Sequence, residues 1–249
     1  MVRLLYLKTN AKIMFEKSFV RTGHFKQFIL LQLFLMLVLL CGRMYAGDIH
    51  GKVIIRKPSL ENSTIVSRSI IRKYVKKMTN SYQMDRGVRG EPTDVVIYID
   101  GLKMENAEKS KIAVMDQIGE KFVPHVLPIL VGSKVKFLNS DDVYHNVFSF
   151  SSAKSFDLGR YANGDFRYVT FRKPGVVNVY CDIHTHMNAF ILVLTNPFFV
   201  QPDAHGEFMI KDVPAGTYTL KAWYGRTPEL SKKITLKQGT DTEVNFLFK

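Results

Sequence analysis

The feature of this sequence that most limits its fold is a long succession of short strand-like runs. From Asp48 onward, runs that alternate between apolar and polar residues, or are apolar throughout, are separated by turn signals such as Asn163-Gly164 and Pro174-Gly175. Such runs predict β-strands, and the glycine, proline and asparagine between them predict turns. The sequence therefore predicts an all-β fold, with a Greek-key β-sandwich followed by a small β-sandwich module.

The predicted strands fall into two groups. Gly132-Ser133 is predicted to join two strands as a hairpin, within a largely antiparallel sheet. After Asn196-Pro197 a second pattern begins, with turns at residues 203–206 and 214–216 and further strands up to the end of the chain. The strands predicted before that point are Asp48–Ile55, Asp94–Asp100, Ile112–Gln117, Lys121–Val131, Lys134–Asn139, His145–Phe150, Phe166–Arg172, Val176–Cys181 and Ala189–Thr195.

One segment between the first two predicted strands has a different periodicity. Val66, Ile70, Tyr74 and Met78 recur every four residues, and basic residues occupy the other faces. This pattern predicts a basic amphipathic helix within a long insertion. The predicted organisation is a signal peptide at 1–46, a first strand plus basic insertion at 47–93, a main β-sandwich at 94–197 and a terminal β module at 198–249.

The N-terminal segment has the pattern of a secretory signal peptide. Phe28–Leu40 is an uncharged apolar run that follows Lys17, Arg21 and Lys26, and cleavage is predicted near Ala46. The run of 13 residues is too short to span a bilayer comfortably. The mature chain is therefore predicted to be periplasmic or otherwise exported, without a membrane span.

The positive charge is concentrated in two places. The chain has a formal net charge of +13, and residues 1–46 hold seven Lys/Arg and one Asp/Glu, so +6 leaves with the signal peptide and +7 remains. Residues 52–77 contain eight Lys/Arg and one acidic residue, Glu61. Such a segment indicates a solvated face, or a surface that associates with an acidic partner or anionic lipid. No nucleic-acid partner is predicted for an exported chain.

The use of cysteine points toward metal chemistry. The chain has two cysteines, and Cys41 lies in the predicted signal peptide, so Cys181 is alone in the mature protein. In an oxidising compartment an unpaired thiol is exposed to oxidation or intermolecular pairing unless it is buried or bound to a metal. The neighbours of Cys181 therefore decide its role.

Those neighbours form a metal-ligand motif. Cys181, His184 and Met187 follow one another at three-residue spacing where a predicted strand enters a turn, and His145 stands at the entrance of an earlier strand. A thiolate, two imidazoles and a thioether are the donors of a mononuclear His₂Cys copper site with an axial methionine. His186 is a possible alternative ligand because it lies next to Met187.

These residues, in this order, resemble the blue type 1 copper proteins, or cupredoxins, of the plastocyanin and amicyanin kind. The resemblance covers residues 94–197, with the short ligand loop most similar to that of amicyanin. It implies one copper ion per chain, cycling between Cu(I) and Cu(II), with His145, Cys181, His184 and Met187 as ligands. It also implies that Asn146 ties the two ligand loops together and that His184 is the electron exit.

The terminal module has a weaker resemblance of its own. Its turn patterning, at Asp203 to Phe208 and again at Val213 to Tyr218, resembles the carboxypeptidase regulatory-like, transthyretin-type β-sandwiches. Modules of that kind imply packing or interaction and add no catalytic residue.

The function predicted from this reading is transfer of single electrons between redox partner proteins, without enzymatic activity. The alternative is periplasmic copper capture or delivery, for which His186 and His125 would supply spare donors. His125 is otherwise a structural histidine.

Three other functions are disfavoured. A thiol hydrolase built on Cys181 and a histidine would leave the Met187 spacing accidental. A multicopper oxidase needs several His-x-His pairs, and the chain offers one, His184-Thr185-His186. A metal-free relative would be expected to lack a ligand, and none of the four is missing.

Overall fold

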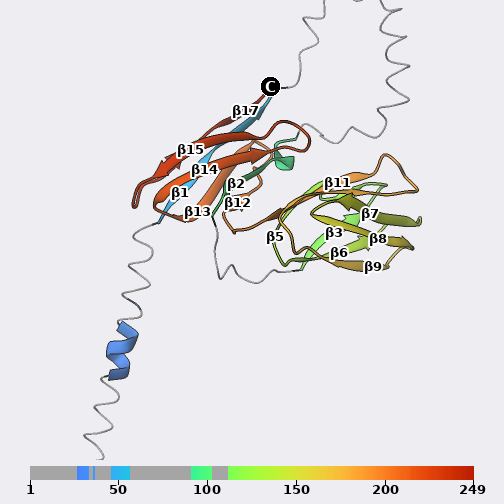
Figure 1. Ribbon diagram of the computed structural model, residues 1–249, viewed down its shortest axis with the longest axis horizontal. Coiled ribbons are helices and arrows are strands. Elements are labelled where there is room, and N and C mark those ends of the chain that lie inside the picture. The colour runs from blue at the N-terminus through green and yellow to red at the C-terminus, as the bar shows by residue number, and fades with distance from the viewer. Residues whose placement is uncertain (1–26, 34–35, 37–45, 57–90, 103–111) are drawn as a thin grey trace, which may run out of the picture. The chain divides into compact units, whose positions relative to one another are not determined.

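The structure is a computed structural model that describes residues 27–33, 36, 46–56, 91–102 and 112–249 (Figure 1). The chain divides into two units, Met1–Ala46 and Gly47–Lys249. Residues 27–33 are helical, and within the described ranges no helix has the length and hydropathy needed to cross a membrane. Cys41 and the predicted basic helix at 66–78 lie outside the described residues.

The prediction of an all-β chain is confirmed for the described residues from Ala46 onward. Among these residues, one 3₁₀ turn, η2 (Pro92–Asp94), accompanies the strands. The strands are β1 (Ala46–Ile55), β2 (Val96–Asp100), β3 (Ala113–Gln117), β4 (Phe122–Val123), β5 (Val126–Leu130), β6 (Lys134–Asn139), β7 (His145–Ser151), β8 (Lys154–Tyr161), β9 (Phe166–Thr170), β10 (Gly175–Tyr180), β11 (Asn188–Leu194), β12 (Phe199–Val200), β13 (Glu207–Pro214), β14 (Gly216–Trp223), β15 (Leu230–Leu236), β16 (Thr242–Glu243) and β17 (Phe246–Phe248).

Strands β3 to β11 form one β-sandwich, which we call the inserted sandwich. One of its sheets has the strand order β5-β11-β10-β7-β8 and the other β4-β3-β6-β9. Alternate side chains of the two sheets meet in a core that contains Phe137, Val147, Val179 and Ile191. Cys181 and Met187 belong to this same core, so two predicted ligands are part of its packing.

Strands β1, β2 and β12 to β17 form a second sandwich, the outer sandwich. Its sheets have the orders β13-β1-β16, with β17 also paired to β1, and β12-β2-β14-β15. In Figure 1, β1 lies among strands from the C-terminal end of the chain. The chain therefore enters the outer sandwich, builds the inserted sandwich from residues 113–194, and returns.

This pairing corrects the predicted assignment of two strands. The sequence placed 94–100 in the main sandwich and 48–55 as its first strand, but β2 pairs with β12 and β14, and β1 pairs with β16 and β17. The alternation of apolar and polar residues indicates which face of a strand is buried. It does not determine which strand pairs with it. The terminal module is thus built from more than residues 198–249.

The connection at Gly132-Ser133 was predicted wrongly as a hairpin. β5 pairs in parallel with β11, and β6 pairs in parallel with β3 and antiparallel with β9. The turn bonds to both sheets, because Val131 donates to Leu194 and Gly132 donates to Phe171. Gly132 has φ +91°, a conformation that glycine adopts without strain. The turn therefore crosses between facing sheets, and the inserted sandwich has mixed rather than largely antiparallel sheets.

Strand β8 was not predicted, although the sequence carries a signal for it. Phe156 and Leu158 alternate with polar residues and pack against the core of the inserted sandwich. Gly159, with φ +64°, interrupts the alternation where the pairing with β7 shifts register. β8 is the edge strand beside β7, where His145 lies.

A third cluster of buried side chains contains residues from both sandwiches. Val126, Phe190 and Leu192 come from the inserted sandwich, and Val96 and Trp223 from the outer one. The rings of Phe190 and Trp223 meet edge to face, with centroids 5.4 Å apart. We call this group the junction cluster.

Candidate metal centre

The loop that carries three of the predicted ligands is closed at its base by strand pairing. Tyr180, the last residue of β10, pairs with Asn188, the first of β11. Within the loop, the backbone N–H of Met187 donates to the carbonyl of His184 at 2.9 Å, which makes a tight turn. Cys181 is 3% exposed and Met187 1%, so both ends of the loop point into the sandwich.

His145 approaches the same place from the start of β7 and is fully buried. The loop before it is organised by Asn139, at the end of β6. The Asn139 amide donates to the carbonyls of Val143 (2.8 Å) and Tyr161 (3.1 Å), and its side-chain oxygen accepts from the N–H of Asp141 (3.0 Å). A buried amide thus fixes the backbone that aims His145.

Three predicted ligands converge in the structure. The Nδ1 atoms of His145 and His184 lie 3.0 Å apart, and Cys181 Sγ lies 3.9 Å from His145 Nδ1. The three ligand atoms all lie within 4.8 Å of one another, and no other such group of His, Cys, Asp or Glu occurs among the described residues. Cys181 is unpaired and buried.

The distances fit a bound metal ion. At about 2.0–2.1 Å to nitrogen and 2.3 Å to sulfur, an ion in tetrahedral geometry requires nitrogens about 3.3 Å apart and sulfur about 3.6 Å from nitrogen. The observed 3.0 and 3.9 Å lie close to both values. Imidazole with thiolate is a donor set that copper accepts in both oxidation states, so these residues fit copper.

The Asp141 carboxylate contacts the nitrogen of the His145 ring that faces away from the ligand cluster. Asp141 was not singled out from the sequence. Its carboxylate lies 2.9 Å from His145 Nε2, so the proton sits on Nε2 and Nδ1 keeps its lone pair for a metal. Burial acts to raise the pKa of Asp141, but the backbone N–H groups of Glu120 and Gly119, together with His145, lower it overall. The carboxylate is therefore held ionised. Its place four residues before His145 was the available signal.

Met187 and His186 point in different directions. Met187 is buried in the same core as Cys181. The His186 side chain is 59% exposed, and its Nε2 lies 3.3 Å from a carboxylate oxygen of Glu120. The structure therefore directs His186 toward the surface and keeps Met187 inside.

Asn146 does not tie the ligand loops together in this structure. Its amide donates to Asp157 on β8 at 2.7 Å. The link from this edge to the cysteine loop is instead an ion pair, Arg160 to Asp182, at 3.1 Å. Both partners of that pair are exposed, so it stabilises the fold little.

His125 stands apart from the ligand cluster and has partners of its own. It is buried between β4 and β5, with Nδ1 3.2 Å from an Asp94 oxygen and Nε2 3.3 Å from the Asn188 oxygen. These contacts are those expected of a structural histidine.

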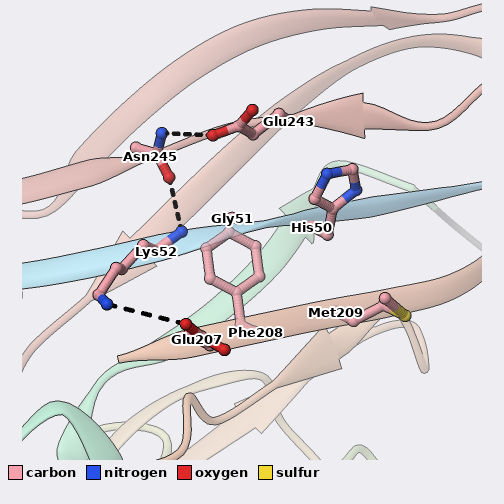
Figure 2. A pocket seen from close by; sticks show the side chains of 8 residues that line it. All are labelled: His50, Gly51, Lys52, Glu207, Phe208, Met209, Glu243 and Asn245. Atoms are coloured by element: carbon pink, nitrogen blue, oxygen red, sulfur yellow. Dashed lines mark hydrogen bonds and ion pairs between the residues drawn. The ribbon is translucent and has the colours of Figure 1, made fainter. Parts of the chain in front are cut away.

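A separate open groove of about 540 Å³ lies on the outer sandwich (Figure 2). Its charged residues already have partners: Lys52 pairs with Glu207 at 3.8 Å, and the Asn245 amide donates to Glu243 at 2.9 Å. It shares no residue with the ligand cluster. The lining residues are His50, Gly51, Lys52, Glu207, Phe208, Met209, Glu243 and Asn245.

The fold and the cluster together define an all-β sandwich protein with a buried His–Cys–His group of the metal-binding type. Comparison with solved structures finds cupredoxins. A copper-containing nitrite reductase from Thermus scotoductus SA-01 is 28% identical over 34% of this chain and 22% of that chain, with a TM-score of 0.32. A purple cupredoxin from Nitrosopumilus maritimus is 26% identical over 33% of this chain and 99% of that one, with a TM-score of 0.31.

A Cu(I) form of an amicyanin variant is 19% identical over 39% of this chain and 98% of that chain, with a TM-score of 0.32. This chain thus spans about a fifth of the nitrite reductase and almost the full length of the two small proteins. No family model and no curated protein matches the sequence.

Proposed function

We propose that the inserted sandwich binds one copper ion through His145, Cys181, His184 and Met187 and carries single electrons between redox partner proteins. The observation that carries this proposal is the convergence of the two Nδ1 atoms and the cysteine sulfur, with separations of 3.0 and 3.9 Å. Bound copper supplies a one-electron couple, Cu(I)/Cu(II).

The side chains around the proposed site fix the positions of the ligands before an electron is transferred. Asp141 holds the tautomer and orientation of His145, and burial of His145, Cys181 and Met187 keeps water from the ligand atoms. Because these side chains are packed into strand ends and a short closed loop, they have little room to rearrange. A site that moves little between two oxidation states suits electron transfer.

We assign the electron exit to His184. Of the clustered side chains, His145 and Cys181 are buried, whereas His184 is partly exposed. An electron can leave through its ring without crossing the core of the sandwich.

The alternative functions have less support. Copper delivery was suggested by spare donors at His186 and His125, but His186 pairs with Glu120 and His125 is engaged by Asp94 and Asn188. A thiol nucleophile needs one base and an accessible sulfur, whereas Cys181 is buried beside two imidazoles. Export through the segment at 1–46 is part of the proposal. In an oxidising compartment the unpaired thiol of Cys181 needs protection, and a bound metal would provide it.

The proposal is tested by the spectrum of the copper-loaded protein. We expect an intense visible band from thiolate-to-Cu(II) charge transfer, bleached reversibly by one electron per chain. The Cys181→Ser variant should lose the band, while His205→Ala, which alters an exposed histidine of the outer sandwich, should keep it. His186→Ala should leave the spectrum unchanged if Met187 completes the site. A colourless Cu(II) complex of the unaltered chain would refute the proposal.

A further inference from the structure

A buried polar group that the proposed electron-transfer function does not use lies next to the junction cluster. Asp94 belongs to η2, immediately before β2 of the outer sandwich. His125 lies between β4 and β5, and Asn188 is the first residue of β11, directly after Met187. Asp94 and His125 are almost fully buried. The three residues connect the outer sandwich to the end of the ligand loop.

The imidazole of His125 joins two side chains that lie far apart in the sequence. Asp94 Oδ2 lies 3.2 Å from Nδ1, and Asn188 Oδ1 lies 3.3 Å from Nε2. The orientation of the Asn188 amide is set by its other end, where Nδ2 donates to the carbonyl of His186 at 3.2 Å. Each ring nitrogen of His125 therefore faces an oxygen atom, and the ring bridges Asp94 and Asn188.

His125 also holds β11 through its backbone. Its carbonyl accepts from the N–H of Phe190 at 2.9 Å, at the point where the parallel pairing of β5 and β11 begins. Its ring meets Phe190 edge-on, with centroids 5.6 Å apart, and Phe190 in turn packs on Trp223. The His125 ring thus contacts the acidic side chain of Asp94 from η2 and the aromatic ring of Phe190 from β11.

We propose that His125 is a positioning residue that fixes the Met187 end of the ligand loop to the outer sandwich. The path runs from Asp94 through both ring nitrogens of His125 to Asn188, and from Asn188 to the carbonyl of His186. This inference rests on the proposed copper function for its effect on electron transfer. The anchoring itself belongs to the protein without metal and can be measured there.

Loss of the imidazole has a definite consequence. A carboxylate and an amide oxygen would remain in a mostly buried place without the ring nitrogens that they face, and buried polar atoms without partners are costly. The base of the loop would then open more often, while His145 on β7, which is held by Asp141 of the preceding loop, would keep its orientation. The effect should therefore be confined to residues 184–188.

The test uses the full chain and three variants. His125→Phe removes both ring nitrogens and keeps a ring, His125→Gln restores a polar side chain, and His205→Ala is the control. In the metal-free protein we expect amide hydrogen exchange at residues 184–188 to be about tenfold faster in His125→Phe and intermediate in His125→Gln. In the copper-loaded protein, the reduction potential should shift in the same order of variants.

The inference would be overturned if exchange at 184–188 in folded His125→Phe equalled that of the unaltered chain. If His125→Phe does not fold, Asp94→Asn provides the same test with a smaller change, and unaltered exchange in that variant would also overturn the inference. If copper does not bind at all, the proposed function fails, but the exchange rates in metal-free protein still decide the role of His125.

Discussion

His145 uses its two ring nitrogens for different purposes. Nε2 faces Asp141 at 2.9 Å, and Nδ1 faces His184 and Cys181. The carboxylate is itself held by the N–H groups of Gly119 and Glu120. A chain of contacts from the β3–β4 turn thereby fixes one ligand ring, and such supports are as important to a metal site as its ligands.

Replacement of Asp141 tests this support at the scale of one residue. Asp141→Asn removes the charge that favours a proton on Nε2 of His145, and we expect copper affinity to fall by about 10- to 100-fold. Competition with a chelator measures the change. Asp142→Asn is the matched control, because the Asp142 carboxylate bonds to Asn163 rather than to a ligand. Equal copper affinities in the two variants would show that Asp141 does not support copper binding.

At the scale of elements, turns decide where the strands go. The turn at Gly132-Ser133 passes the chain from one sheet to the other, and Gly51 on β1 allows a close approach to the segment around Val244. A Cβ atom built on Gly51 would lie 1.9 Å from the carbonyl oxygen of Val244. The outer sandwich therefore requires glycine at that position if β1 is to lie against the C-terminal strands.

The turn before β13 gives a pH-dependent prediction. The Asp203 carboxylate accepts hydrogen bonds from the N–H groups of Glu207 and His205, and the Glu207 bond is the main cause of its lowered pKa. Because the folded-state pKa lies below the ordinary 3.8, the stabilisation is present above pH 3.8 and is lost as the pH falls through the folded value.

Asp203→Asn should therefore be less stable than the unaltered chain at pH 6, and the two should converge as the pH falls below the folded-state pKa of Asp203. Thermal unfolding of the metal-free proteins across this range measures the difference, and high salt should reduce it because Asp203 is exposed. A difference that grows as the pH falls would contradict the assignment.

At the scale of the whole Gly47–Lys249 unit, the two sandwiches share buried surface. Trp223, the sole tryptophan of the chain, comes from β14 and packs on Phe190 of β11. Since β11 begins where the ligand loop ends, packing in the junction cluster and anchoring of the loop involve the same strand. The inserted sandwich is one stretch of chain, residues 113–194, whereas the outer sandwich is assembled from the segments before and after it.

Truncation of Trp223 tests how much the junction cluster contributes to the free energy of unfolding. Trp223→Ala should lower the free energy of unfolding by about 3–5 kcal/mol, the usual cost of removing a buried large aromatic side chain. Urea unfolding followed by far-ultraviolet circular dichroism gives the value. Phe150→Ala is the control, since Phe150 is 82% exposed and its loss should change stability by no more than about 0.5 kcal/mol. Similar values for both variants would show that the junction carries little stability.

Much of the site could be read from the sequence because its chemistry is local. Cys181, His184 and Met187 lie in one loop, and their donor types at that spacing already point to a soft metal. His145 was found from its place at the start of a strand. Asp141 was missed, because a carboxylate near a histidine is common on protein surfaces and only the fold turns this one toward Nε2.

The sequence by itself determined that the described part of the chain after residue 46 is built of strands and which donors could bind a metal. These properties follow from side-chain alternation and from local spacing. The tertiary structure alone decided that β1 and β2 join the C-terminal strands, that Gly132-Ser133 crosses between sheets and that His125 links Asp94 to Asn188. Strand pairing uses backbone hydrogen bonds, which are the same for every residue except proline, so the choice of neighbour depends on packing between residues far apart in the chain.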